Sequence, residues 1–367
     1  MNMLLAGLVG MALIALTPIS EAGTLETLVN FNVSSGKYPL DVGLTNVSGI
    51  LYGTTSKGGA AGDGTLYSYN PSNGNLKTRA TFHGSIYLQP YGSLTDFNGK
   101  LYGMTMGGGP ANEGTVFSFD LSNGNLKTLA SFTGSVNSLT DFGSKLYGTT
   151  ILDGPAGDGT LFSYDPSNGN LKTLASFTGS NGKNPNGLTK VGDILYGTTS
   201  EGGPAGVGTL FSYNLSNGNL KTLARFNGPN GKEPNGLTKV GDILYGTTSK
   251  GGKTGDGTLF SYNLSNGNLK TLVRFNGPND KSPNDLTNVN GTLYGTTFGT
   301  VGWGTLFSYV PSNGNLKTLA HFNGPNGLNP QGRLIYLNGT LYGTTVAGGA
   351  NGSMGGDGTI FAYQLTP

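Results

Sequence analysis

Short runs of hydrophobic and aromatic residues alternate with glycine-rich turns along most of the chain. In one representative unit these runs are Gly187–Val191, Ile194–Thr198, Thr209–Asn214 and Leu220–Phe226. Each run is rich in β-branched or aromatic residues, and Gly, Asn, Asp and Pro lie around it, which is the pattern of strands joined by turns. No window keeps the period of an amphipathic helix. The pattern predicts an all-β protein built from four-stranded units.

Within this unit, the third and fourth runs are joined by a strong hairpin signal. Asn217 and Gly218 both tolerate a positive φ, as a two-residue hairpin turn requires. The third run, Thr-Leu-Phe-Ser-Tyr from Thr209, carries bulky groups on both faces. We therefore expect antiparallel sheets, each packed between two others.

Three motifs repeat along the chain. The tripeptide Leu-Tyr-Gly begins at Leu51, Leu101, Leu146, Leu195, Leu244, Leu293 and Leu341. A Gly-Thr-apolar-aromatic motif begins at Gly64, Gly114, Gly159, Gly208, Gly257, Gly304 and Gly358. The heptapeptide Ser-Asn-Gly-Asn-Leu-Lys-Thr begins at Ser72, Ser122, Ser167, Ser216, Ser265 and Ser312. The Leu-Tyr-Gly spacing of 45 to 50 residues is typical of β-propeller blades.

The two ends of the repeat array are complementary. Thr24–Phe31 matches the fourth strand of a unit with no earlier strands before it, and Gly358–Tyr363 matches a third strand with no fourth strand after it. A circular propeller closes in this way, because the first strand of the chain completes the last blade. An open β-solenoid, the alternative, has no use for such a split. We predict seven four-stranded blades with the ring closed by the N-terminal strand.

The repeated unit also resembles a known family. Leu51–Tyr69, Leu195–Tyr213, Leu244–Tyr262 and Leu341–Tyr363 combine Leu-Tyr-Gly-Thr-Thr, a glycine-rich loop and Gly-Thr-apolar-aromatic, and they are similar to the GloVer tandem repeat. This is a bacterial extracellular repeat, so the resemblance implies an exported bacterial β-propeller. It implies no catalytic residues.

The first 22 residues differ from the rest. Leu4–Leu16 is an apolar run of the length found in signal peptides, and Ser20 and Ala22 are small residues at the positions that a signal peptidase reads. We expect cleavage after Ala22 and a secreted protein, extracellular or periplasmic. Residues 23–367 then form a single propeller domain. No later stretch is apolar enough to span a membrane.

Composition narrows the classes of partner. Lys and Arg number 21 against 19 Asp and Glu, and the lysines are spread through the repeats, so no basic stripe for nucleic acid is expected. The absence of Cys excludes disulfides and thiolate chemistry. We expect a monomer with no cofactor and no bound metal.

The candidate binding residues lie in the connections between blades. These connections share one face of a propeller with the loops inside each blade between its second and third strands, and they vary while the hairpins repeat, as binding loops do. Four carry a lysine at one equivalent place: Lys37, Lys183, Lys232 and Lys281. In the connection before the last blade, Leu328 replaces it and Arg333 follows. These cations are expected to form a basic funnel for an anionic or hydroxylated ligand, unless they only aid solubility.

Two further groups of residues need an explanation. The connection after the first unit carries His83, Ile86, Tyr87, Gln89 and Tyr91, and its aromatics and amide suit sugar rings, although local packing is the alternative. An acidic residue precedes the Gly-Thr motif at Asp63, Glu113, Asp158, Asp256 and Asp357. Val207 and Trp303 interrupt this series, so we expect turns closed by Asp side chains instead of calcium sites.

Catalytic motifs are absent from the sequence. No Gly-x-Ser-x-Gly, His-Glu-x-x-His or P-loop occurs, and only two His are present, His83 and His321. Glu233, Asp280, Asp285 and Asp41 are the carboxylates nearest the candidate face. Our first hypothesis is a non-enzymatic module that binds a glycan, a surface polymer or a protein. The alternatives are a structural surface protein and a polysaccharide-active enzyme, either a hydrolase or a lyase that uses Tyr38 or Tyr91 with Lys37 or Arg333.

Overall fold

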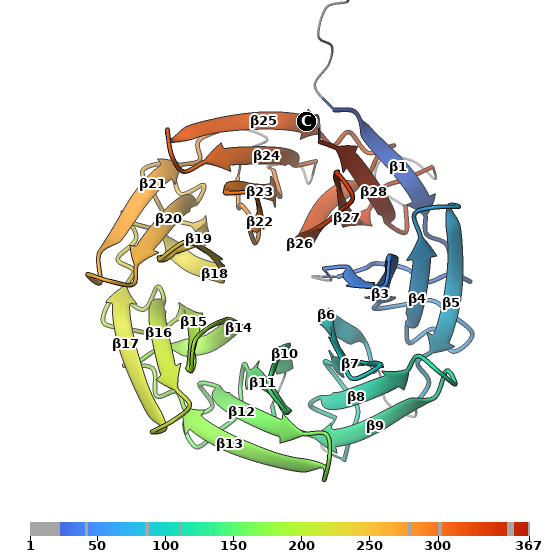
Figure 1. The fold of residues 1–367 in the computed structure, drawn as a ribbon, viewed down its shortest axis with the longest axis horizontal. Coiled ribbons are helices and arrows are strands. Elements are labelled where there is room, and N and C mark those ends of the chain that lie inside the picture. The colour runs from blue at the N-terminus through green and yellow to red at the C-terminus, as the bar shows by residue number, and fades with distance from the viewer. Residues whose placement is uncertain are drawn as a thin grey trace, which may run out of the picture.

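The computed structural model describes residues 23–40, 43–84, 88–110, 112–134, 136–277, 281–299, 303–350 and 356–365. In this part of the chain, seven four-stranded antiparallel sheets form a ring around a central channel (Figure 1). The predicted seven-bladed β-propeller is confirmed. The predicted signal peptide lies outside the described residues. Among the described residues, we find no helix with the length and apolar character needed to cross a membrane.

Each blade contributes one strand to each of four concentric layers, with the blades numbered by their Leu-Tyr-Gly motifs. The innermost strands are β2 (Thr45–Val47), β6 (Pro90–Phe97), β10 (Val136–Phe142), β14 (Lys183–Val191), β18 (Lys232–Val240), β22 (Thr287–Val289) and β26 (Leu328–Leu337). The second layer holds β3 (Ile50–Thr55), β7 (Lys100–Thr105), β11 (Lys145–Thr150), β15 (Ile194–Glu201), β19 (Ile243–Lys250), β23 (Thr292–Thr297) and β27 (Thr340–Ala347).

The two outer layers complete the sheets. The third layer holds β4 (Thr65–Asn70), β8 (Thr115–Asp120), β12 (Thr160–Asp165), β16 (Thr209–Asn214), β20 (Thr258–Asn263), β24 (Thr305–Val310) and β28 (Thr359–Gln364). The outermost strands are β5 (Asn75–Thr81), β9 (Leu126–Ser131), β13 (Asn170–Ser176), β17 (Asn219–Arg225), β21 (Leu269–Arg274), β25 (Asn315–His321) and β1 (Leu25–Asn30). In the fourth blade, the innermost strand therefore begins four residues before its predicted start.

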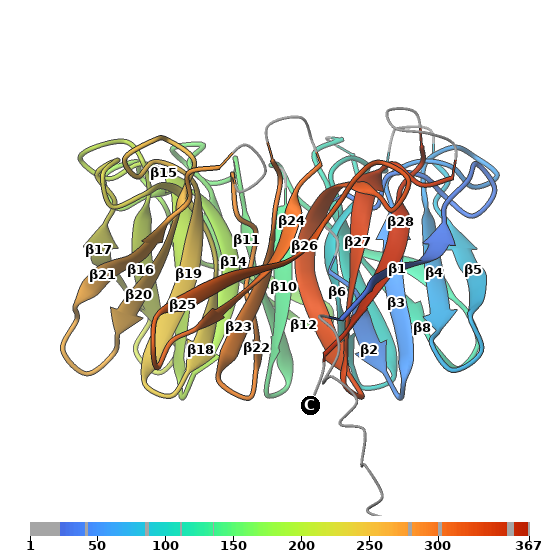
Figure 2. The same ribbon diagram turned by 90° about the horizontal axis from the view of Figure 1, so that it is seen from above.

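The strands run between two rims of connections (Figure 2). The loop face carries the connections between blades, such as 177–182, and the loops between second and third strands, such as 202–208. The hairpin face carries the tight turns, such as 192–193 and 215–218. The candidate connections thus share the loop face, as predicted.

The N-terminal strand closes the ring. β1 pairs antiparallel with β28, with Leu25 opposite Tyr363 and Thr27 opposite Phe361. Phe31, directly after β1, packs edge to face against Tyr67 of the first blade at 5.0 Å between ring centroids. The first strand of the chain therefore joins the last blade to the first, which confirms the predicted closure.

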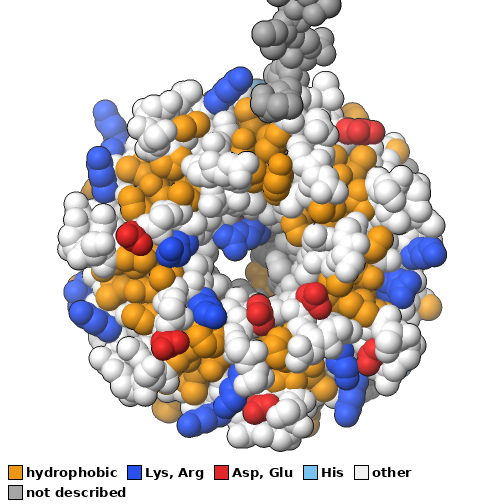
Figure 3. Space-filling model, viewed as in Figure 1, with side chains coloured by type: hydrophobic (Ala, Val, Ile, Leu, Met, Phe, Trp, Pro, Cys, Tyr) orange, Lys and Arg blue, Asp and Glu red, His pale blue; other side chains and the backbone are white. Residues whose placement is uncertain are grey.

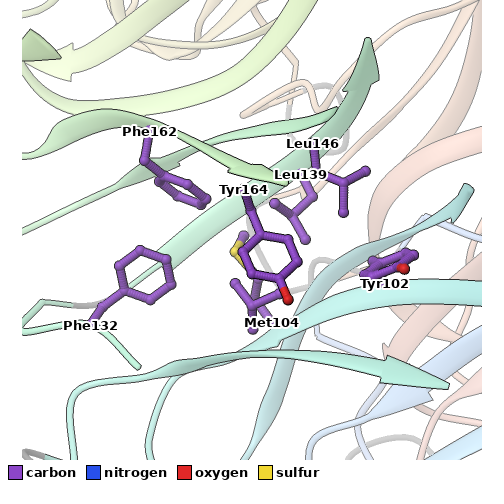
Figure 4. Close-up of a cluster of buried hydrophobic side chains, with 8 residues drawn as sticks. Tyr102, Met104, Phe132, Leu139, Leu146, Phe162 and Tyr164 are labelled. Atoms are coloured by element: carbon purple, nitrogen blue, oxygen red, sulfur yellow. The ribbon is translucent and has the colours of Figure 1, made fainter. Parts of the chain in front are cut away.

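The same aromatic contact joins every blade to the next. A Phe that follows each outermost strand packs against an aromatic ring in the third layer of the following blade, with centroids 4.7 to 5.4 Å apart. Such pairs add about 0.5–1.5 kcal/mol each beyond the burial of their area. Figure 4 shows one such boundary, where Phe132 of the second blade meets Phe162 of the third among buried Leu139, Leu146 and Tyr164.

The repeated motifs have direct packing reasons. In the fourth blade, a Cβ on Gly197 of Leu-Tyr-Gly would lie 2.5 Å from the Phe211 ring, so glycine makes room for the aromatic layer. Gly208 of Gly-Thr has a φ of +110°, and Pro234 of the next blade approaches it closely. The hydroxyl of Thr209 lies 2.9 Å from that of Thr199, and an equivalent buried threonine pair occurs in every blade.

One aromatic position differs from its six equivalents, which are all Phe. Tyr67 is fully buried, and its hydroxyl has no hydrogen-bond partner among the described residues. Burial raises the pKa of this hydroxyl far above its ordinary value. A buried polar group without a partner destabilises the folded state, because it exchanges its bonds to water for none.

We therefore expect Tyr67→Phe to raise the free energy of unfolding by about 1 kcal/mol. The matched reverse change, Phe211→Tyr, places a hydroxyl at the same position of the fourth blade and is expected to lower it by about 1–3 kcal/mol. Urea unfolding followed by tryptophan fluorescence measures both. A loss of stability in Tyr67→Phe would contradict the prediction.

Candidate functional site

The channel wall is built from hydrogen bonds between neighbouring blades. Four asparagines of the innermost layer each donate from Nδ2 to a proline carbonyl of the next blade, at 2.6 to 2.9 Å; they are Asn137, Asn186, Asn235 and Asn284. Below them, threonine hydroxyls of blades 1 to 6 donate to a leucine carbonyl of the next blade; they are Thr45, Thr95, Thr140, Thr189, Thr238 and Thr287. Most polar side chains of the wall therefore hold the ring together.

The asparagine series is interrupted where the ring closes. Leu40, Tyr91 and Gln331 stand at the equivalent position of blades 1, 2 and 7. One consequence is visible in the first blade: the buried Thr54 hydroxyl has no partner in the described structure, whereas the amide of Asn186 reaches Thr198 in the fourth blade. The wall is thus asymmetric, and its departures from the repeat lie side by side in three consecutive blades.

A cavity of about 300 Å³ occupies the channel at this level. Tyr91 and Arg333, two of the predicted binding residues, line it together with the four asparagines and Asp285. Asp285 accepts a hydrogen bond from the backbone N–H of Gly236 at 2.7 Å through one carboxylate oxygen. The cavity therefore combines an aromatic ring, a carboxylate and a guanidinium in one concave space.

Arg333 is held firmly against the wall by neutral groups. Its Nε donates to the Leu286 carbonyl at 2.9 Å, and its Nη2 donates to the Leu237 carbonyl at 3.4 Å and to the Thr238 hydroxyl. These acceptors belong to blades 6 and 5, so this one side chain joins three blades. It forms none of the ion pairs among the described residues, although Asp285 lines the same cavity.

The predicted lysines of the loop face meet the predicted acids. Three ion pairs cross blade boundaries: Lys37 with Asp357 at 3.0 Å, Lys183 with Asp158 at 4.0 Å, and Lys281 with Asp256 at 3.0 Å. Each joins the lysine of one blade to the acid of the preceding blade. Three acids of the series thus form ion pairs that the sequence did not predict, and three of the four cations expected to form a funnel are paired with carboxylates.

Lys232 is the exception among the four. Val207 stands where the preceding blade would supply the acid, and Lys232 forms no ion pair within the described part of the chain. Its neighbour Glu233 instead pairs with Lys250 at 3.1 Å. The missing carboxylate leaves Lys232, alone among the four equivalent lysines, without an ion pair in the described part of the chain.

The remaining candidates lie elsewhere. Tyr38 and Gln89 each stand directly before a proline and have a positive φ, of 55° for Tyr38 and 37° for Gln89. Neither residue lines the channel cavity. Their carbonyls accept bonds from Ser56 and Met106, which fixes both loops. Tyr87, Ile86, Asp41 and Asp280 lie outside the described residues. Within the described residues, no three His, Asp or Glu side chains gather as a metal site would require.

A second cavity, of about 430 Å³, lies toward the hairpin face and was not predicted from the sequence. Lys239, Asn288, Arg333 and Tyr336 are among the residues that line it. Arg333 was among the predicted residues; the signal that points to Lys239, Asn288 and Tyr336 is their position directly after the innermost-strand threonine, or after Ile335 in the last blade, which changes from blade to blade.

The ion pairs give a direct test of how the loop face is stabilised. Burial alone would raise the pKa of Asp256, but hydrogen bonds from Thr254 and Lys281 and the lysine charge together lower it. A carboxylate whose pKa is lowered by folding stabilises the protein above the pKa of the unfolded group and loses that effect as the pH falls.

We expect Val207→Asp to supply the missing partner of Lys232 and to raise the free energy of unfolding at pH 7 by about 0.5–1 kcal/mol. The gain should be much smaller at pH 3, because protonation of the carboxyl removes it progressively as the pH falls below about 4. Asp256→Val, which gives the fifth blade the arrangement of the fourth, should lose a similar amount. Urea unfolding at both pH values measures the effect, and a gain of equal size at pH 3 would exclude the ion pair as its cause.

Comparisons with known proteins agree with this architecture. The sequence model described as the Gloeobacter/Verrucomicrobia repeat matches residues 13–144 and 135–299. No curated protein matches the chain. Among solved structures, the computationally designed Ika8 protein is similar with a TM-score of 0.56 and 13% identity, over 92% of this chain and 99% of that one.

A chain of the Mitotic Checkpoint Complex is similar with a TM-score of 0.62 and 13% identity over the whole of both chains. At such identities these structures show a shared fold and nothing about function. The family match is different in kind, because it covers most of the repeats and agrees with the resemblance of their motifs to the GloVer repeat. The chain belongs to the Gloeobacter/Verrucomicrobia repeat family.

Proposed function

We propose that the protein is an exported binding module that holds a polar ligand, a glycan or a surface polymer, in its central channel. The fold and the repeat family support a binding or interaction module in general. The observation that carries the finer proposal is the channel cavity, in which Tyr91 and Arg333 face the same space. Both residues depart from the repeat, and both lie where the ring of asparagines is interrupted.

The chemistry of this cavity suits a hydroxylated ring. A tyrosine ring offers a flat apolar surface with a polar edge, while Asp285 and Arg333 offer an acceptor and a donor for hydroxyl groups. The volume of about 300 Å³ lies at the lower end of small-ligand sites and accommodates one or two sugar units. A longer polymer would therefore enter by its end or by a single unit.

The position of Arg333 supports binding by a preformed site. Its guanidinium is fixed by carbonyl and hydroxyl acceptors of two other blades, so little side-chain entropy is lost when a ligand arrives. The same cavity keeps one enzymatic alternative open, because Tyr91 and Arg333 are one of the tyrosine–cation combinations considered for a lyase. Lys37, by contrast, is paired with Asp357.

A glycan array with the mature protein tests the binding proposal. Tyr91→Asn gives the second blade the asparagine of Asn186, and we expect it to lower the affinity for any bound glycan by about tenfold, as loss of a stacking aromatic does. Tyr38→Asn is the matched control, since Asn184 occupies that position and Tyr38 lies outside the cavity. It should leave the affinity unchanged.

Three results would contradict this proposal. One is the absence of any bound glycan or polymer in the wild-type protein. Another is an equal loss of affinity in both variants. The third is conversion of the bound sugar to an unsaturated or shortened product, which would assign the cavity to an enzyme.

Export is tested separately in a bacterial host with an intact secretion pathway. We expect the protein outside the cytoplasm to begin at Gly23, because Ser20 and Ala22 form the predicted cleavage site. Mass spectrometry of the intact protein from each cell fraction measures this. An uncleaved chain that stays in the cytoplasm would contradict export.

A further inference from the structure

A ring of exposed side chains surrounds the channel on the hairpin face. One residue from the innermost strand of each blade contributes, directly after the threonine of the wall or its Ile335 equivalent. In blade order these residues are Asn46, Asp96, Asp141, Lys190, Lys239, Asn288 and Tyr336, and all of them are exposed. Two neighbouring acids are followed by two neighbouring lysines, so the mouth has an acidic side and a basic side. Figure 3 shows basic and acidic side chains on different sides of the open channel.

The basic side carries a shallow depression that is open to solvent. The cavity of about 430 Å³ noted above extends over blades 5, 6 and 7; its lining consists of Thr238, Lys239, Thr287, Asn288, Arg333, Leu334, Ile335 and Tyr336. Lys190 and both acids of the ring are not part of this lining. The concave surface thus contains one of the two ring lysines together with Arg333, and neither of the ring's acids.

Two positive charges in this cavity form no ion pair with a carboxylate among the described residues. Neither Lys239 nor Arg333 takes part in the ion pairs that the described residues form. Arg333 is oriented by three neutral acceptors, which fix the guanidinium without cancelling its charge. A concave surface with two uncompensated cations attracts an anion, and the effect is strongest where a guanidinium is already in place.

The seventh blade supplies the rest of the site through its departures from the repeat. Three residues separate Pro330 from Leu334, against two between Pro234 and Leu237, so the register shift that β18 also has is one residue longer in β26. Such a bulge redirects side chains, here Arg333. Beyond it, Ile335 replaces the wall threonine, so this boundary has an apolar side chain in place of a hydrogen bond.

An aromatic ring lies at the edge of the same cavity. Tyr336 stands where the other blades have Asn, Asp or Lys, and it is 40% exposed. An exposed aromatic beside a polar amide, that of Asn288, and two cations is suited to a ligand with a flat or ring-shaped body and an attached anion. The aromatic, the amide and the charges come from three different blades.

We propose that this cavity is a second binding site, selective for a small ring compound that carries a carboxylate, such as a uronic acid. The ring of the ligand would lie on the Tyr336 side chain. Lys239 and Arg333 would receive the carboxylate, and Asn288 a hydroxyl of the ring. The proposal does not depend on the ligand of the channel cavity. Because Arg333 lines both cavities, the test varies other residues.

Isothermal titration of the mature protein with glucuronate, glucose and acetate tests the proposal. We expect glucuronate to bind at least several times more tightly than glucose or acetate. Lys239→Gln should weaken glucuronate binding about threefold to fivefold, the effect of one exposed charge pair. Tyr336→Asn, which restores the residue of blades 1 and 6, should weaken binding of glucuronate and leave that of acetate unchanged.

Lys190→Gln is the matched control. Lys190 occupies the same position of the neighbouring blade, is exposed like Lys239 and carries the same charge, but its Nζ lies over the Phe142 ring at 3.6 Å and outside the cavity. Glucuronate affinity should therefore stay within about twofold of the wild type, since only the general field of the protein changes. Thermal unfolding of each variant checks that the fold is kept.

The outcomes separate the two sites. Equal loss of glucuronate affinity in Lys239→Gln and Lys190→Gln would show attraction by the general charge of the protein alone and would overturn the proposal. Glucose binding as tightly as glucuronate would also overturn it, and so would the absence of glucuronate binding at millimolar concentration. If Tyr91→Asn abolishes glucuronate binding while Lys239→Gln does not change it, the anion occupies the channel cavity. That result would overturn this second site and leave the proposed function standing.

Discussion

Everything in this structure depends on the contact between one blade and the next. A phenylalanine after each outermost strand packs against an aromatic ring of the following blade, and this contact closes the ring between Phe31 and Tyr67 as it does elsewhere. A single four-stranded sheet cannot bury both its faces, so each blade is stable only between two neighbours. The same boundary must therefore be formed seven times, and this requirement explains why the repeats are so similar.

The boundary also determines which polar residues are available for function. Asparagine amides, threonine hydroxyls and lysine–acid pairs connect neighbouring blades and stabilise the ring. A residue that recurs at the same position of several blades therefore has a structural role there. Function is expected where the boundary changes. Tyr91, Arg333 and Tyr336 all lie near the closure of the ring, where the asparagine series is broken.

Arg333 shows how a departure from the repeat places a fixed positive charge in the channel. One extra residue in β26 turns its side chain across the channel, where carbonyl oxygens of blades 5 and 6 hold it. A lysine at that place could reach the same acceptors only as a mobile point charge, whereas a guanidinium presents fixed donors. The two cavities therefore share one rigid cation, although their other lining residues and their faces differ.

Much of the fold could be read from local patterns. The period of the motifs, the Asn-Gly hairpin turns and the split between the two chain ends depend on residues close in sequence or on repetition, so they predict the blades, their strands and the closure by Thr24–Phe31. The arrangement of the candidate residues could not be read in the same way. Tyr91 was named because its connection departs from the repeat, and Arg333 because it is the cation that follows the place of the missing lysine, but nothing in their spacing shows that they line one cavity.

The tertiary structure alone decided the pairing of charges and the shape of the channel. Lys183 and Asp158 belong to different blades, and Lys37 and Asp357 lie at opposite ends of the chain, so no local pattern identifies them as partners. The residues around the hairpin-face mouth are about 50 positions apart and meet only because the ring closes. A sequence of repeats determines what each blade is, because turns and strands form locally, and the packing of the blades determines which side chains remain for a ligand.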